Sequence, residues 1–225
     1  MAKLRKEEIQ RKILHFIFGT IMPLGIFYLP QFAVPVGWKY APWTLAPVIL
    51  AAFLLGFILT ETIRLQVQVA HKLFSRYFGS MLRVEESNTA TGATYINAAG
   101  LICSIVFKNQ PAVACMVLST FIWGDAVAAL VGQSIGRIKI GKKSLEGSLG
   151  CFAMSMVLYM VVFPFVPDLL DAFGGKTPLL FAIVGSMCVT VFELIPLRIT
   201  PHLVINDNLF VPVITGLLLL LMYPT

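Results

Sequence analysis

The chain has 225 residues, of which 58% are hydrophobic and only 12% are charged, and its formal net charge at pH 7 is +6. Because a soluble domain carries about 25% charged residues, this composition excludes an ordinary soluble enzyme. The apolar residues come in long blocks, and backbone polar groups inside lipid must be hydrogen-bonded within the protein. We therefore predict an all-α, polytopic integral membrane protein.

In chain order, seven apolar segments are predicted to be transmembrane helices. A helix needs roughly 20 mainly apolar residues to cross a bilayer, and the segments cover residues 13–30, 44–63, 93–107, 111–131, 147–166, 178–196 and 209–223. After the second segment, apolar side chains alternate with His71, Lys72 and Arg76. This pattern predicts a short helix lying in the membrane interface. We expect residues 1–225 to form one membrane-embedded domain.

The basic residues predict a cytoplasmic N-terminus. With that orientation, fourteen of the 17 Lys and Arg residues fall on the cytoplasmic side, and only Lys39, Lys108 and Lys176 fall on the other side. Cytoplasmic loops of membrane proteins are enriched in Lys and Arg. The positive charge is therefore explained by anionic lipid headgroups and an anionic substrate, and not by nucleic acid. Most of the acidic residues share this face, and metal binding is one explanation for them.

Two groups of charged residues flank the first two predicted helices. Arg11, Lys12 and His15 stand at the start of the first, where Arg11 and His15 share one helix face. An ordinary basic membrane anchor is the alternative for this group. Glu61 and Arg64 have i, i+3 spacing at the end of the second predicted helix. They form either a plain ion pair or part of a site.

Further polar candidates for a functional site lie in three places. These are the loop before the third predicted helix, the end of the sixth and the start of the seventh. Glu193 is nearly intramembrane and has no partner close in sequence, which favours a functional role because ionisable groups in a membrane are costly. Asp207 and Asn208 open the last predicted helix, where a helix cap is the alternative role. The loop candidates are Glu85, Glu86 and Asn88.

The densest group of candidates runs through residues 124–148. Asp125 is an ionisable residue inside an apolar segment, which again indicates a functional site. Small residues recur every four positions at Gly124, Ala128, Gly132 and Gly136, and helix packing alone would also explain that smooth face. The loop that follows contains lysines, and lysines combined with bare backbone amides bind phosphate oxygens well.

Residues 136–142 nearly match the phosphate-binding pattern GxxxxGK[ST]. Lys143 stands where Ser or Thr is required, and the preceding segment is a predicted membrane helix instead of a strand. We therefore exclude a true P-loop and keep the expectation of a phosphate site.

The chain resembles the polyprenol, dolichol, phytol and diacylglycerol kinases over nearly its whole length. The motifs that carry the resemblance are Arg11-Lys12-x-x-His15, the run Asp125-x-x-Ala128-x-x-x-Gly132-x-x-x-Gly136 continuing through Lys143-Ser144-x-Glu146-Gly147-Ser148, and Asp207-Asn208-x-x-x-Pro212. The long central motif is the most specific of the three. The resemblance implies phosphoryl transfer from a nucleoside triphosphate, usually CTP, to the hydroxyl of a membrane lipid alcohol, with a divalent metal such as Mg²⁺.

The resemblance, together with the need of phosphoryl transfer for positioning and charge neutralisation, suggests roles for these residues at the cytoplasmic face. Asp125 is the better-placed base, although the sequence leaves open which carboxylate is base and which is metal ligand. The predicted catalytic residues are Asp125, Arg11, Lys12 and His15. The predicted nucleotide-binding residues are Gly132, Gly136, Lys142, Lys143, Ser144, Gly147 and Ser148. The predicted metal ligands are Asp125, Glu146, Asp207 and Asn208, with Glu85, Glu86, Asn88 and Glu193 as additional candidates.

Two other functions compete with the kinase. A phosphatidate cytidylyltransferase-like enzyme would attack the α-phosphate of CTP and release pyrophosphate. A small transporter or lipid-binding protein would use no nucleotide, but transporters place their binding groups near the membrane midplane, often in repeats. The ionisable residues here gather at one predicted face without a repeat, which favours an enzyme. The sequence identifies neither the lipid alcohol nor the nucleotide base.

Overall fold

The structure is a computed structural model that describes residues 6–79, 84–141, 143–195, 198–200, 203–204 and 206–224. Side chains are described over the same ranges except at 6–15, 18, 84–85, 198–200 and 203–204. The helices are α1 (Lys6–Phe32), α2 (Leu45–Gln66), α3 (Gln68–Phe78), α4 (Gly92–Val106), α5 (Pro111–Ser134), α6 (Leu145–Val157), α7 (Leu179–Leu194) and α8 (Asp207–Leu220). The predicted all-α class is confirmed.

Each of the seven predicted apolar segments falls on a helix. Within the described residues, three helices are long and apolar enough to cross a membrane, namely Pro42–Gln66, Pro111–Ser134 and Leu145–Phe165. Gly92–Val106, Leu179–Leu194 and Asp207–Leu220 are apolar but shorter. These helices indicate a membrane protein. Seven complete spans and a cytoplasmic N-terminus stay predictions.

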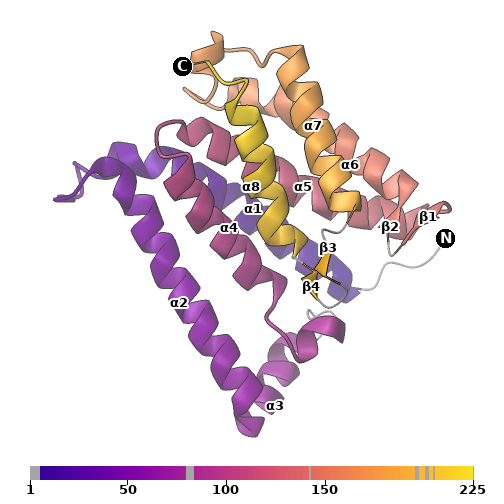
Figure 1. The fold of residues 1–225 in the computed structure, drawn as a ribbon. Coiled ribbons are helices and arrows are strands. Elements are labelled where there is room, and N and C mark those ends of the chain that lie inside the picture. The colour runs from indigo at the N-terminus through magenta and orange to yellow at the C-terminus, as the bar shows by residue number, and fades with distance from the viewer. Residues whose placement is uncertain are drawn as a thin grey trace.

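Helix α5 is the centre of the bundle. It packs against α1, α6, α7 and α8, and also touches α4. Its most apolar stretch is 78% buried inside the protein, whereas the corresponding stretch of α2 is only 22% buried. Accordingly, α2 runs along one edge of the molecule and α3 turns away from its end (Figure 1). A helix that is apolar all round is expected to be buried, and α5 fits this rule.

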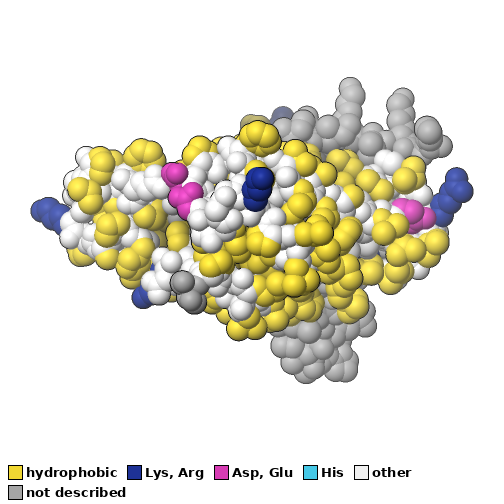
Figure 2. All heavy atoms as spheres, turned by 90° about the horizontal axis from the view of Figure 1, so that it is seen from above, with side chains coloured by type: hydrophobic (Ala, Val, Ile, Leu, Met, Phe, Trp, Pro, Cys, Tyr) yellow, Lys and Arg dark blue, Asp and Glu magenta, His cyan; other side chains and the backbone are white. Residues whose placement is uncertain are grey.

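The outer surface of the bundle is largely apolar. Figure 2 shows one face on which apolar side chains predominate and charged side chains are few. Phe53 on α2, Leu180 on α7 and Phe165 beyond α6 are exposed by 60%, 64% and 83%, respectively. In water so many exposed apolar side chains would form an unusual surface, but they suit contact with lipid.

Two features of the backbone differ from the uninterrupted helices and loops that the sequence predicts. The predicted helix 147–166 changes after α6 into a π-helix at Leu158–Val162 and a 3-10 turn at Phe163–Phe165. Two short antiparallel hairpins also form, from β1 (Lys139–Ile140) with β2 (Lys143–Ser144), and from β3 (Arg198–Thr200) with β4 (Leu203–Val204). The helix α3 (Gln68–Phe78) confirms the predicted short helix, and its place in the interface stays a prediction.

Tight helix packing predicts a difference between two glycines. A Cβ at Gly216 of α8 would lie 2.4 Å from the ring of Phe107, which is fully buried, whereas a Cβ at Gly56 of α2 would meet nothing within 4 Å. We expect Gly216→Ala to lower the unfolding free energy by about 1–3 kcal/mol, because a packed ring must move. Thermal unfolding in detergent measures the effect.

The matched control is Gly56→Ala, which should leave stability unchanged or raise it by up to about 1 kcal/mol, since alanine favours helix. Equal unfolding temperatures for Gly216→Ala and the wild type would contradict the packing of α8 against α4.

Candidate functional site

The segment after α5 folds back onto the start of α6. Residues Ile140 and Lys143 pair across the β1–β2 hairpin, and Gly141 at its turn has a φ of +61°, which glycine adopts without strain. Ser144 caps α6, because its Oγ accepts a hydrogen bond of 3.1 Å from the backbone N–H of Gly147. The Ser148 hydroxyl donates to the carbonyl of Ser144 at 3.2 Å. These bonds fix the direction in which Lys143 leaves the hairpin.

Glu146, a predicted metal ligand, closes this loop. Its Oε1 accepts hydrogen bonds from the backbone N–H groups of Arg137 at 2.9 Å and Ile138 at 3.1 Å. The carboxylate is therefore held on the loop backbone, and a role in metal binding stays a prediction.

Three glycines allow α5, the loop after it and α6 to pack closely. A Cβ at Gly132 of α5 would lie 2.8 Å from Oγ of Ser144, and one at Gly136, which lies in the loop beyond α5, would lie 2.6 Å from the same atom. A Cβ at Gly147 of α6 would lie 2.7 Å from the carbonyl oxygen of Ala128. Helix packing, which the sequence left as an alternative, thus accounts for Gly132 and Gly147, whereas Gly136 packs from the loop against Ser144. Their contact with a nucleotide stays a prediction.

Lys143 joins three parts of the chain at one point. Its ammonium lies 2.6 Å from Oε1 of Glu193, in the last turn of α7, and 3.1 Å from Oδ2 of Asp207, the first residue of α8. It also donates to the backbone carbonyl of Glu193. We call Lys143, Glu193 and Asp207 the lysine cluster. Glu193 lies 50 positions and Asp207 lies 64 positions from Lys143 in the chain, so the fold alone brings the three residues together.

Two carboxylates contact one ammonium in the lysine cluster. Asp125 of α5, only 7% exposed, interacts electrostatically with Glu193. Burial favours a lower pKa for Lys143, but the carboxylates of Glu193 and Asp207 outweigh it, and the net effect raises the pKa of Lys143. Lys143 is therefore positively charged throughout the neutral range. The Lys143 side chain is 29% exposed and that of Asp207 is 27% exposed, so the cluster is open to solvent.

Asn208 connects the start of α8 with the start of α4. Its side-chain amide donates to the carbonyl of Gly92 at 3.3 Å, and its backbone N–H donates to Oδ1 of Asn206 at 3.0 Å. Glu86, from the loop before α4, accepts a bond of 2.8 Å from the N–H of Gly92. Two predicted site residues from separate segments, Glu86 and Asn208, thus meet at Gly92, and Asn88 is exposed nearby in the same loop.

Five predicted site residues are not described by the structure, or are described at the backbone alone. The backbones of Arg11, Lys12 and His15 belong to α1, and that of Glu85 belongs to the 3-10 turn Val84–Ser87, but the side chains of these four residues are not described. Lys142 is not described at all.

The oxygen ligands of the site are of the type that Mg²⁺ prefers, but they do not form a preformed metal cage. No group of three His, Cys, Asp or Glu side chains within the described ranges is arranged to hold a metal ion. Protein sites for Mg²⁺ often supply only one or two carboxylates and leave the remaining positions to phosphate oxygens and water. The chemistry of the ligands therefore fits Mg²⁺ together with a nucleotide.

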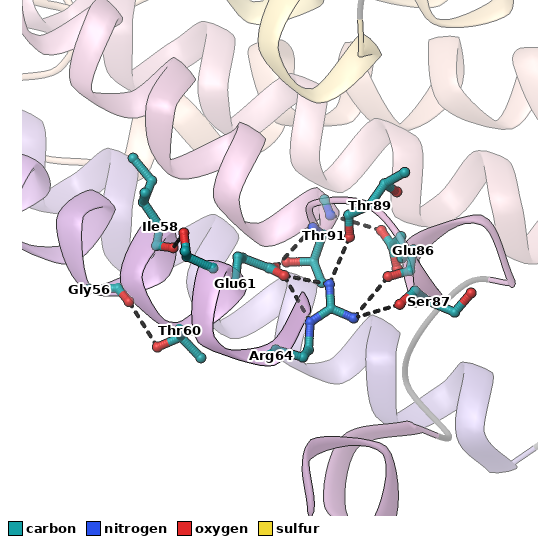
Figure 3. A network of polar contacts seen from close by, with 11 residues as sticks. Gly56, Ile58, Thr60, Glu61, Arg64, Glu86, Ser87, Thr89 and Thr91 are labelled. Carbon is teal, nitrogen blue, oxygen red and sulfur yellow. Dashed lines mark hydrogen bonds and ion pairs between the residues drawn. The ribbon is translucent and has the colours of Figure 1, made fainter. Parts of the chain in front are cut away.

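Sequence reasoning underestimated Glu61 and Arg64. Both side chains are buried, and Figure 3 shows Arg64 bonded to Glu61 and to the loop that precedes α4. The i, i+3 spacing was the only signal of this pair, and it gives no indication of the loop contacts.

Two relatives match almost the whole chain. The first is an uncharacterized protein of Rickettsia prowazekii, with 27% identity over 215 residues, covering 91% of this chain and 89% of that protein. The second is the CTP-dependent diacylglycerol kinase 1 of Schizosaccharomyces pombe, with 29% identity over 223 residues, covering 96% of this chain and 94% of that protein. No family model and no solved structure matches the chain. The similarity to the second relative supports lipid kinase activity for this chain, without specifying the lipid.

The lysine cluster predicts that Lys143→Met destabilises the protein. Removing the ammonium leaves Glu193 and Asp207 facing each other without a cation. We expect a loss of about 1–3 kcal/mol at pH 7, less than for a fully buried pair because Lys143 is partly exposed. Denaturant unfolding in detergent measures the loss, and Lys139→Met, at an exposed position of the same hairpin, should change stability by less than about 0.5 kcal/mol.

The raised pKa of Lys143 determines how its ion pairs change the stability of the fold with pH. The stabilisation by these ion pairs is complete below the ordinary lysine pKa of about 10.4. It disappears as the pH rises through the higher pKa that Lys143 has in the folded state. The difference between wild type and Lys143→Met should therefore persist from pH 7 to pH 9 and narrow only in stronger alkali. A difference that vanishes by pH 9 would contradict the ion pairs.

Proposed function

We propose that this protein is a CTP-dependent lipid kinase that transfers the γ-phosphoryl group of CTP to the hydroxyl of a membrane lipid alcohol at the cytoplasmic face. Diacylglycerol is the first acceptor to test, and polyprenol, dolichol and phytol present the same hydroxyl chemistry. The observation that carries the proposal is the similarity to a CTP-dependent diacylglycerol kinase over 96% of the chain. Residues 1–225 would act as a single membrane-embedded domain.

The lysine cluster supports the phosphate chemistry of this proposal. In the proposed complex, phosphate oxygens replace part of the contact between the Lys143 ammonium and Asp207. The side chains of both residues are partly exposed to solvent, so a phosphate is able to reach the ammonium. Helix α6 begins at Leu145, two residues after Lys143, and the N-terminus of a helix favours anions.

The excess of carboxylates supports a role for a divalent cation. Glu193 and Asp207 both contact the single ammonium of Lys143, so a triphosphate bound here would need additional positive charge beside these carboxylates. Asp207 and Asp125 are the residues that would hold Mg²⁺ together with the phosphates, with Asn208 beside them. When bound, Mg²⁺ would neutralise part of the phosphate charge. Arg11, Lys12 and Lys142 would add further positive charge.

The proposed reaction has one covalent step. The oxygen of the lipid hydroxyl forms a bond to the γ-phosphorus, the bond between that phosphorus and the bridging oxygen of CDP breaks, and CDP leaves with the electron pair. Asp125 accepts the hydroxyl proton in the proposal, because it is the carboxylate that lies within the apolar part of α5, where a lipid headgroup would arrive. The products are CDP and a phosphorylated lipid.

The proposal is tested by following the label from CTP. Purified protein in detergent with Mg²⁺ is offered a panel of lipid alcohols and, in parallel, phosphatidate. It is supplied with γ-³²P-CTP, or with the corresponding UTP, ATP and GTP. A labelled lipid from the γ-phosphate, strongest with CTP and diacylglycerol, is expected. Labelled lipid from α-³²P-CTP with release of pyrophosphate would instead establish cytidylyl transfer. Folded protein that yields no labelled lipid from either form would overturn both enzymatic functions.

Asp125→Asn should reduce kcat by at least about 100-fold, since the amide removes the proton acceptor. The change is nearly isosteric, so the variant should unfold within a few degrees of the wild type. The matched control is Asp171→Asn, an exposed aspartate in the turn Asp171–Phe173 on the predicted outer side, which should keep full activity. Near wild-type turnover by Asp125→Asn would remove Asp125 from the proposed site.

A further inference from the structure

The guanidinium of Arg64 is saturated with hydrogen bonds. Arg64 lies in the last turn of α2, and only 2% of it is exposed. Its Nε donates to Oε2 of Glu61 at 2.9 Å, its Nη1 donates to the carbonyls of Glu86 at 3.0 Å and Ser87 at 3.2 Å, and its Nη2 donates to the carbonyl of Thr89 at 2.7 Å and to Glu61. These five bonds use the five N–H donors that an arginine has.

Apart from Glu61 on α2, the partners of Arg64 lie in one loop. The three carbonyls belong to residues 86–89, and Oε1 of Glu61 accepts a further bond of 3.0 Å from the backbone N–H of Thr91 (Figure 3). Phe74 of α3 covers the guanidinium, with 5.1 Å between its ring centroid and Cζ of Arg64. Arg64 and Glu61 together thus fix residues 86–91, which lead into α4.

The loop continues into the candidate site through Gly92. Glu86 accepts a bond from the N–H of Gly92, and Asn208 donates to the Gly92 carbonyl. The contact is so close that a Cβ at Gly92 would lie 2.6 Å from Nδ2 of Asn208 and 3.3 Å from Oε1 of Glu86. Asn208 is adjacent to Asp207, which binds Lys143. A continuous polar path therefore runs from the end of α2 to the lysine cluster.

We propose that Glu61 and Arg64 are positioning residues for the site. They fix residues 84–92, and through Gly92 they hold Asn208 and Asp207 where Asp207 meets Lys143. The role in catalysis rests on the proposed function, whereas the positioning of α8 does not. A buried ion pair often contributes little to stability by itself, so the four bonds that Arg64 and Glu61 make to a single loop point to control of its position. Lysine has three donors and no planar fork and could not replace Arg64.

The test uses Arg64→Lys and Gly92→Ala in the full-length protein in detergent. Arg64→Lys keeps the charge opposite Glu61 and loses the loop contacts, whereas Gly92→Ala leaves the ion pair intact and disturbs the contact with Asn208. The control is Arg76→Lys, at an exposed position of α3. For each variant, amide hydrogen exchange is measured in residues 84–92 and in residues 206–210, and kcat and the nucleotide KM are measured with CTP and the accepted lipid.

Arg64→Lys should speed amide exchange in both segments and lower kcat/KM roughly 10- to 100-fold, the loss expected when groups at a site shift by about 1 Å. Arg76→Lys should match the wild type in both respects. Faster exchange in residues 84–92 alone, with kcat/KM within about twofold of the wild type, would overturn the proposal.

Gly92→Ala provides the second, independent test if Arg64→Lys does not fold. It should speed exchange in residues 206–210, and unchanged exchange there would also overturn the proposal. Combining Arg64→Lys with Asn208→Ala should reduce kcat/KM no more than the more damaging single change, because both changes act on one path. Losses that multiply would show that Arg64 does not act through Asn208. A wild type without kinase activity would overturn the proposed function, while the exchange data would still decide the positioning of α8.

Discussion

The ammonium of Lys143 is the point on which the arrangement of the site depends. Three elements far apart in the chain end or begin there, namely the β1–β2 hairpin, α7 and α8, and each contributes to one set of ion pairs. The hairpin is in turn fixed by Ser144, which caps α6, and by Glu146, which binds the loop backbone. The polar contacts thus place a cation and several carboxylates at one end of an otherwise apolar bundle.

The composition of this cluster also limits its chemistry. A site for an anion alone would carry an excess of positive charge, yet here Glu193 and Asp207 both contact one lysine. That balance suits a ligand that brings cations with it, as a nucleoside triphosphate with Mg²⁺ does. The similarity to a CTP-dependent diacylglycerol kinase points to the same chemistry from an independent direction.

The sequence predicted the helices better than the contacts between them. Apolar blocks located the helices because lipid-facing and buried helices share that signal, and the mixed pattern at residues 67–81 located α3. The π-helix at Leu158–Val162 and both hairpins were missed, since they depend on packing and on pairing within loops. Asp125 and Glu193 were singled out because charge is costly in a membrane, and Lys143 because lysines beside bare backbone amides bind phosphate. Nothing in one sequence shows that Glu193 and Asp207 reach Lys143. The face of Gly132 and Gly136 was predicted to receive a nucleotide, and in the structure Ser144 packs against it.

Binding of CTP to the lysine cluster is measured directly, so the result does not depend on the choice of lipid. The affinity of purified wild type and Lys143→Met for CTP is measured by calorimetry with and without Mg²⁺, with Lys139→Met as the control. Wild type and Lys139→Met are expected to bind CTP more tightly with Mg²⁺ than without it. Lys143→Met is expected to bind CTP roughly 10-fold more weakly or worse, as expected for the loss of a charge-assisted contact to phosphate. Equal affinities in the wild type and Lys143→Met would contradict the assignment of the lysine cluster as the phosphate site.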